Sequence, residues 1–234
     1  MNILALETSS HHLSVALWRD GACIERGERV ANGGSERLLP WVNELLAEAG
    51  LKLADLDGIA FGAGPGGFTG LRLACGVAQG LACGLDLPVL GVSTLEALAL
   101  AAHAHGADRV FACLDARMNE VYCAAYLLRD GVAETIIAPF VAPPQDVSLP
   151  TDAGEGWVGC GDGFAAYPEL LAGHAARMTR IIPELVPTAA AVAQLAAPRL
   201  ARGEGLDAAL AMPLYVRDKV ALTTAERLAR GGLK

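Results

Sequence analysis

Two acidic residues stand where α/β proteins commonly hold a ligand. Glu7 ends the first apolar run of the chain, and Asp115 ends a similar run in its second half. Acids at the carboxyl ends of leading strands can face one cleft and hold a hydrated magnesium ion. Thr8 and Ser9 offer hydroxyl groups beside Glu7, but no basic residue stands next to them to bind a phosphate. We therefore treat these four residues as a candidate nucleotide or metal cleft of low affinity, with turn capping as the structural alternative.

A glycine-rich run, from Phe61 to Arg72, is the second candidate. It lacks the lysine with which a phosphate loop reaches the phosphates. It also follows the fourth predicted strand, whereas a Rossmann fingerprint follows the first strand of a βαβ unit. We interpret the run as a strand-to-helix turn that lets the chain pass close to a neighbour, in preference to an anion cradle at a helix N-terminus.

Metal and nucleophile chemistry has little support in the sequence. The five histidines form no H-x-x-x-H pair, the six cysteines form no C-x-x-C pair, and no G-x-S-x-G motif is present. The cysteines stand singly in apolar surroundings and are expected to be buried thiols in a reducing compartment. The sequence therefore predicts neither a catalytic residue nor a bound metal.

The composition limits the partners. The chain has 234 residues, a net charge of -8 and a pI near 5.1, so a broad basic face that binds RNA or DNA directly is disfavoured. The N-terminus lacks a basic leader, and the longest apolar stretch, Leu73 to Leu85, is too short to span a bilayer. We expect a cytoplasmic protein without membrane contact. Hydrophobic residues make up 53% and charged residues 19%, which indicates either surplus apolar surface or a bias toward alanine and leucine.

The patterns of the first half predict an antiparallel meander followed by alternating helices and strands. Asp20-Gly21 is typical of a hairpin turn, Ser35 is a candidate helix cap, and Gly50 is a candidate helix stop. The expected strands cover residues 3–6, 13–18, 23–30, 56–61 and 87–91, and the expected helices cover residues 35–49, 69–85 and 93–105.

The second half repeats this opening. A strand that ends in an acid, a polar turn, a second strand, an Asp-Gly hairpin and a third strand occur again over residues 110–137. The further elements expected are a short strand at 157–160, a helix at 188–202 and a last short strand at 214–217. The repeat predicts an α/β chain of two similar half-domains, residues 1–105 and 106–234, of which the second is reduced.

The helix expected at 69–85 carries two stripes of small residues. Gly76, Gly80 and Gly84 recur every four residues, beside a stripe formed by Ala74, Ala78 and Ala82. Each glycine costs a helix interior about 1 kcal/mol relative to alanine. Such a stripe allows another backbone to approach closely. The neighbour is either the chain's own sheet or the helix of a partner, and the spacing alone leaves both open.

Several longer motifs, spread in order over essentially the whole chain, resemble those of the bacterial TsaB (YeaZ) family. They are Ile3 to Ser9 as the opening strand, Leu38-Leu39-Pro40, the GPGGFTGLR turn from Gly64 to Arg72, Gly91 to Leu95, Asp115 to Tyr122, and Pro213 to Arg217. The resemblance implies an actin/Hsp70-like (ribonuclease H-like) fold. The chain departs from the family's pattern at Glu7, where an aspartate is common, and at Gly34, where a histidine is often found.

The resemblance also implies a function. The family's members are noncatalytic subunits needed for threonylcarbamoyl transfer to adenosine 37 of tRNA. They pair with the catalytic paralogue TsaD, to which the metal-binding histidines belong, and a P-loop ATPase, TsaE, joins them. By the same resemblance the chain meets tRNA indirectly through the complex, ATP or ADP could sit at the shared interface, and the chain could form a homodimer when its partner is missing.

The family's pairing surface uses its first two helices, which correspond to Ser35 to Ala49 and Thr69 to Leu85. Leu38, Val42 and Leu45 are expected to bury part of their surface in the partner. The full set of residues that we predict at this interface is Leu38, Leu39, Trp41, Val42, Leu45, Leu46, Leu73, Gly76, Val77 and Gly80.

Two enzymatic alternatives stay open. A self-sufficient ATPase or kinase of the actin-like class would use Glu7 and Asp115 with magnesium, and the isolated chain would bind ATP tightly. A peptidase would need a nucleophile or a metal set that we do not find in the sequence.

Overall fold

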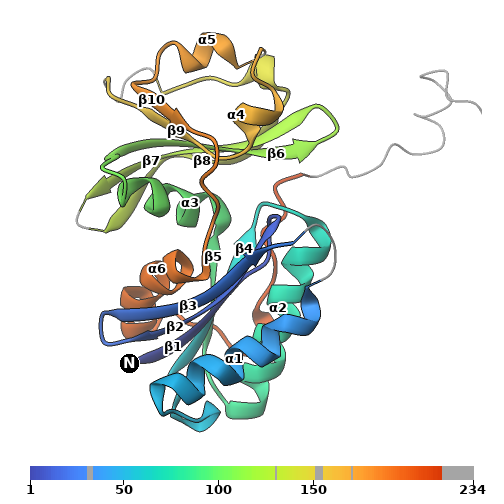
Figure 1. The fold of residues 1–234 in the computed structure, drawn as a ribbon, viewed down its shortest axis with the longest axis vertical. Helices are drawn as coiled ribbons and strands as arrows, with labels where there is room; N and C mark the ends of the chain where they lie inside the picture. Colours follow the sequence, from blue (N-terminus) through green and yellow to red (C-terminus); the bar gives the residue numbers. More distant parts are fainter. Residues whose placement is uncertain (31–33, 130, 151–154, 170, 218–234) are drawn as a thin grey trace, which may run out of the picture.

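The computed structural model describes residues 1–30, 34–129, 131–150, 155–169 and 171–217. Two mixed five-stranded sheets lie one above the other, with helices between them and on both outer sides (Figure 1). The chain is therefore an α/β protein built in layers, as the sequence predicts.

The first sheet has the strand order β3-β2-β1-β4-β5. Its strands are β1 (Asn2–Glu7), β2 (His12–Arg19), β3 (Ala22–Arg29), β4 (Gly58–Gly64) and β5 (Val89–Ser93). The first three form an antiparallel meander, while β4 pairs with β1 and β5 in parallel. The turn between β2 and β3 needs two left-handed residues, which Asp20 (φ 48) and Gly21 (φ 94) supply.

The second sheet repeats this plan, with the order β10-β9-β6-β7-β8. Its strands are β6 (Arg109–Arg117), β7 (Glu120–Arg129), β8 (Val132–Ala142), β9 (Val158–Cys160) and β10 (Arg180–Ile182). The leading strand β6 pairs antiparallel with β7 and parallel with β9, as β1 does with β2 and β4. The predicted duplication is therefore visible in the strand pairing, and the second copy has the shorter parallel strands.

The longer helices cover both faces of the first sheet. Alternating residues of β1 face opposite ways: Leu4 and Leu6 pack beneath α1 (Ser35–Ala49) and α2 (Phe68–Leu85), while Ile3 and Ala5 join the core around α3 (Thr94–His103) and α6 (Ala189–Ala201). Helix α3 also packs on β6 and β7, so it lies between the two sheets. The short elements are α4 (Gly163–Ala166), α5 (Ala172–Ala175), η1 (Leu53–Asp55), η2 (Pro144–Asp146) and η3 (Ala208–Leu210).

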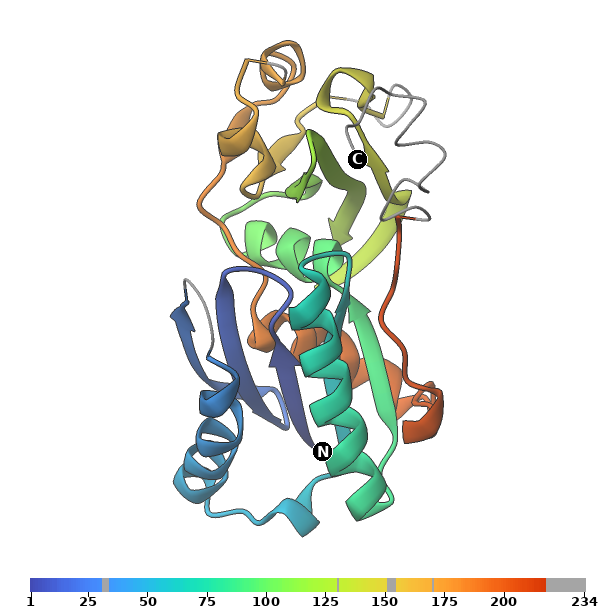
Figure 2. The ribbon, with the colours of Figure 1, turned by 90° about the vertical axis from the view of Figure 1, so that its right-hand side faces the viewer.

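The C-terminal part of the described chain returns to the first sheet. Helix α6 packs on β1, β2 and β4, Leu206 then bridges Val89 at the sheet edge, and the Leu214 amide donates to the Ala63 carbonyl (2.7 Å). The segment runs beside β5 toward the second sheet (Figure 2). The division between residues 105 and 106 falls between α3 and β6, and the chain after residue 188 contributes again to the first half.

Several local predictions are wrong. Leu214 to Arg217 is not a strand, because Pro213 has no N–H to donate and a single ladder bond, that of Leu214, joins this segment to β4. Ser35 is the first residue of α1 and not its cap; Gly34 (φ 89) takes the cap position. Two of the cysteines expected to be buried, Cys23 and Cys83, are exposed.

Candidate functional site

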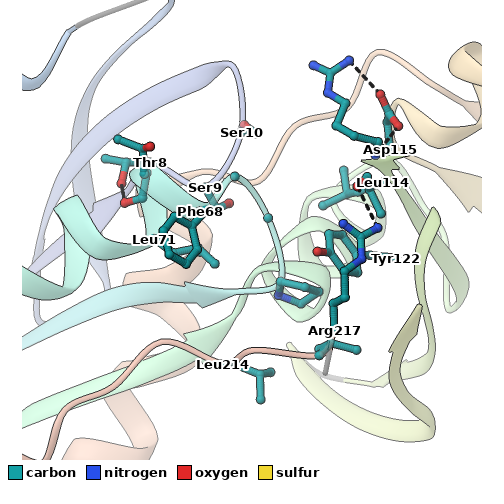
Figure 3. A pocket seen from close by; sticks show the side chains of 18 of the residues that line it. Thr8, Ser9, Ser10, Phe68, Leu71, Leu114, Asp115, Tyr122, Leu214 and Arg217 are labelled. Carbon is teal, nitrogen blue, oxygen red and sulfur yellow. Dashed lines mark hydrogen bonds and ion pairs between the residues drawn. The ribbon is translucent and has the colours of Figure 1, made fainter. Parts of the chain in front are cut away.

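A cavity of about 460 Å³ lies between the two halves. The turn after β1, the glycine-rich turn that begins α2, the end of β6 and the C-terminal segment from Leu214 to Arg217 line most of it (Figure 3). Tyr122 of β7 and Asp162 complete the lining. Thr8, Ser9 and Asp115 are among the lining residues, as predicted for the cleft. The glycine-rich run is a strand-to-helix turn, in which Gly66 and Gly70 leave no room for a Cβ atom beside the backbone of Thr8 and Ser9.

Glu7 does not line this cavity. Its side chain is fully buried, its Oε1 accepts a hydrogen bond from the Ser9 amide (2.6 Å), and its Oε2 has no hydrogen-bond partner among the described residues. Burial raises the pKa of this carboxyl above its ordinary value, so the neutral form is favoured. The carboxyl sits against β4, where a Cβ on Gly62 would lie 1.9 Å from Oε2. Glu7 is thus a core acid and not a ligand that reaches the cleft.

Asp115 faces the cleft, but other groups of the chain occupy both of its oxygens. Oδ1 accepts from the Arg117 amide (2.7 Å) and from the Tyr167 hydroxyl (3.1 Å), and Oδ2 pairs with the Arg117 guanidinium (2.9 Å). The hydroxyls predicted beside Glu7 are engaged as well: Thr8 donates to the Gly70 carbonyl (2.6 Å), and Ser9 accepts from Thr94 (3.2 Å).

These residues do not fit a magnesium–nucleotide site. A hydrated magnesium ion needs ionised carboxylates with free oxygens, whereas Glu7 is buried away from the cleft with its pKa raised by burial, and Asp115 is already paired. Across the part of the chain that the structure describes, no group of three His, Cys, Asp or Glu side chains could hold a metal ion. No catalytic step can therefore be built on the predicted pair of acids.

The buried Glu7 predicts a pH-dependent stability. In the unfolded chain this carboxyl ionises near its ordinary pKa of 4.5, whereas the folded chain keeps its proton to higher pH. The free energy of unfolding should thus fall as the pH rises above that value, until the folded-state pKa is passed. In Glu7→Gln this loss is absent, so in urea unfolding the variant should gain stability relative to the wild type as the pH rises above 4.5.

Glu44→Gln is the matched control, because Glu44 is exposed on α1. It should keep the pH dependence of the wild type. The same dependence in Glu7→Gln would show that Glu7 is ionised in the folded protein.

On α1, four of the predicted interface residues belong to the chain's own core. Leu38, Val42, Leu45 and Leu46 are between 0% and 4% exposed and pack against the first sheet. The apolar stripe that identified the helix is the face that an amphipathic helix buries against the core of its own chain. The prediction that Leu38, Val42 and Leu45 contact a partner is therefore wrong. A charge at Leu45 would be buried in the core and would unfold the chain instead of testing an interface.

On α2, the predicted glycines face outward. Ala74, Ala78 and Ala82 are fully buried against the sheet, whereas Gly76 and Gly80 are exposed, and a Cβ added to either would meet nothing within 4 Å. This excludes the chain's own sheet as the close neighbour of the glycine stripe among the described residues. Figure 2 shows α2 in front of the sheet with its outer side uncovered.

Helix α2 is apolar over its whole length. The helix has 18 residues with a mean hydropathy of 1.2, of which 28% are buried, so by length and composition alone it could cross a membrane. Leu73 and Val77 are half-buried beside the glycines, and on α1 Leu39 is 50% exposed and Trp41 half-buried. We use the name outer helix face for the predicted interface residues that are not buried in the core, on both helices together: Leu39, Trp41, Leu73, Gly76, Val77 and Gly80.

Sequence reasoning missed an apolar segment next to this face. Both Gln79 (3.0 Å) and Cys75 (3.5 Å) of α2 donate to the Ala211 carbonyl, which ties the C-terminal segment to the helix. Its large apolar side chains are 41% to 75% exposed; they are Leu206, Leu210, Met212, Leu214 and Tyr215. The only signal in the sequence is a cluster of large apolar residues without helical or strand period.

Comparison with known proteins gives consistent matches. A family model described as TsaD, tRNA N6-adenosine threonylcarbamoyltransferase, matches residues 28–224. A protein of Escherichia coli (strain K12) named tRNA threonylcarbamoyladenosine biosynthesis protein TsaB is 38% identical over 228 residues, which cover 94% of this chain and 96% of that protein. The protein of the same name from Haemophilus influenzae is 49% identical over 123 residues, 52% of each chain. The solved structure of YeaZ from Pseudomonas aeruginosa is 43% identical, with a TM-score of 0.82 over 92% of this chain and 99% of that one.

Proposed function

Because this chain belongs to the bacterial TsaB (YeaZ) family, with its actin-like fold, we propose that it is a noncatalytic subunit for threonylcarbamoyl transfer to adenosine 37 of tRNA. It acts in the cytoplasm by binding and supporting a TsaD-like catalytic paralogue. A TsaE-like P-loop ATPase joins the two proteins, and tRNA meets this chain through the complex. The binding of ATP or ADP at the shared interface, and a homodimer in the absence of the partner, stay predictions.

The observation that carries this proposal is the contrast between the cleft and the outer helix face. Glu7 is buried outside the cleft and Asp115 is paired within it, which leaves the ATPase and kinase alternative without its two acids. On the outer helix face, glycines line an uncovered helix whose other side is already packed. Each of these glycines costs helix stability, and a close helix–helix contact recovers that cost through packing. We infer that the TsaD-like paralogue is the partner that covers this surface.

The proposal is tested by mixing the purified chain with the TsaD-like protein of the same genome. Size-exclusion chromatography with light scattering should show a complex that neither protein forms alone, and the isolated chain should hydrolyse no ATP. The proposal fails if the two proteins elute separately at micromolar concentration. ATP hydrolysis by the isolated chain that depends on Asp115 would instead support the enzymatic alternative.

A further inference from the structure

Arg72, near the N-terminal end of α2, is held by two aromatic residues. The guanidinium carbon of Arg72 lies 3.8 Å from the centroid of the Phe68 ring, and its Nε donates to the Tyr215 hydroxyl (3.1 Å). The two rings lie 6.0 Å apart, tilted by 36°. Phe68 and Tyr215 are each 49% exposed. We call these three residues the Arg72 cluster.

The guanidinium of Arg72 has no acidic partner among the described residues. The two arginines that line the cleft are paired, in contrast, Arg117 with Asp115 and Arg217 with Glu120. The contacts of Arg72 engage the plane of the guanidinium and its Nε, so the two terminal amino groups stay available. An arginine whose stem is fixed by stacking loses little side-chain entropy when it binds a carboxylate with both amino groups.

The Arg72 cluster lies in line with the glycine stripe. Arg72, Gly76 and Gly80 follow at intervals of four residues, so they share one side of α2. A partner helix that packed along Gly76 and Gly80 would therefore contact Arg72 at one end. The cluster is therefore continuous with the outer helix face, and Tyr215 adds the C-terminal segment to that surface.

We propose that the Arg72 cluster binds a carboxylate side chain of the TsaD-like partner and anchors one end of the interface. The inference rests on the proposed function and adds the chemistry of one contact to it. A fixed guanidinium with two free amino groups matches the two oxygens of a carboxylate. Fixed aromatic and arginine side chains are also the usual energetic centres of protein interfaces. RNA phosphate is the less suitable ligand, because the chain carries a net charge of -8 and the cluster continues an apolar face.

The first test measures binding of the full-length chain to the TsaD-like protein by isothermal titration calorimetry. Arg72→Gln should weaken binding about 30-fold, and Tyr215→Phe, which removes the hydroxyl that orients Nε, about 3-fold. Arg129→Gln removes the same charge from an exposed site on β7 and should bind as the wild type does. Equal affinities for Arg72→Gln and Arg129→Gln would overturn the inference.

The second test identifies the ligand. Arg72→Lys places an amine at the same position, and a carbodiimide should join it to a partner carboxylate in an amide bond that mass spectrometry maps to residue 72. If the complex forms but no such link appears, no carboxylate lies there and the inference is wrong. If Arg72→Gln keeps its affinity for the partner but lowers tRNA binding by the complex, the ligand is RNA. If the wild type binds no partner at all, the proposed function itself has failed.

Discussion

Replacing Gly80 by leucine is expected to leave this protein folded and to abolish its binding to the TsaD-like partner. Gly80 is an exposed residue of α2, and a Cβ added there would meet nothing within 4 Å in the free chain. Leucine is also a better helix former than glycine. In the complex, however, a leucine would hold the partner's backbone away from α2. We expect binding in calorimetry to weaken by roughly 100-fold or more.

Gly173→Leu is the control for this variant. Gly173 is an exposed glycine in α5, which lies over the second sheet far from α2, and a Cβ there would also meet nothing within 4 Å. This variant should bind as the wild type does. Unchanged affinity of Gly80→Leu, with the fold confirmed by circular dichroism, would show that the glycine stripe is not the contact surface.

Replacing Gly70 by alanine is expected to destabilise the fold strongly, although Gly70 lies on the same helix. A Cβ at Gly70 would lie 1.9 Å from the carbonyl oxygen of Thr8, a backbone atom that cannot turn aside. Thr8 in turn donates to the Gly70 carbonyl (2.6 Å), so the first turn of α2 is held close to the end of β1. We expect a loss of about 2–4 kcal/mol in the free energy of unfolding, measured in urea.

Gly76→Ala provides the comparison. Gly76 has open space around it, so alanine should raise the free energy of unfolding by about 0.5–1 kcal/mol through its helix propensity. If the free energy of unfolding falls in Gly70→Ala and rises in Gly76→Ala, the fold requires glycine at position 70 and does not require it at position 76. Similar effects at both positions would contradict the close packing between α2 and the turn after β1.

The elements with a clear period were predictable from the sequence. The apolar stripe between Gly34 and Gly50 gave the bounds of α1, because local periodicity and a glycine stop agree there. The Asp20-Gly21 turn fixed the first hairpin, and its repetition revealed the duplication. The tight turn at Gly64 to Gly70 could also be predicted, because so many glycines in one turn indicate that another segment of backbone passes close to it.

Which face of each helix is buried in the core could not be predicted from the sequence. On α1 the leucine stripe fits a core or an interface equally well, and the structure places Leu45 at 0% exposure in the core. On α2 the alanines and glycines differ by one methyl group, and only the packing shows that Ala78 faces the sheet and Gly80 faces outward. The burial of Glu7 likewise could not be predicted, because it depends on contact with β4, a strand that lies about 50 residues away along the chain.

The most direct measurement of the proposed role is the formation of threonylcarbamoyladenosine in tRNA by the reconstituted system. The TsaD-like and TsaE-like proteins, with substrates, would be combined with the wild type, with Gly80→Leu or with Asp115→Asn, and the modified nucleoside would be quantified by mass spectrometry. We expect product with the wild type and with Asp115→Asn, and none with Gly80→Leu or without this chain. Product with Gly80→Leu and none with a folded Asp115→Asn would contradict a partner role and place the chemistry in the cleft.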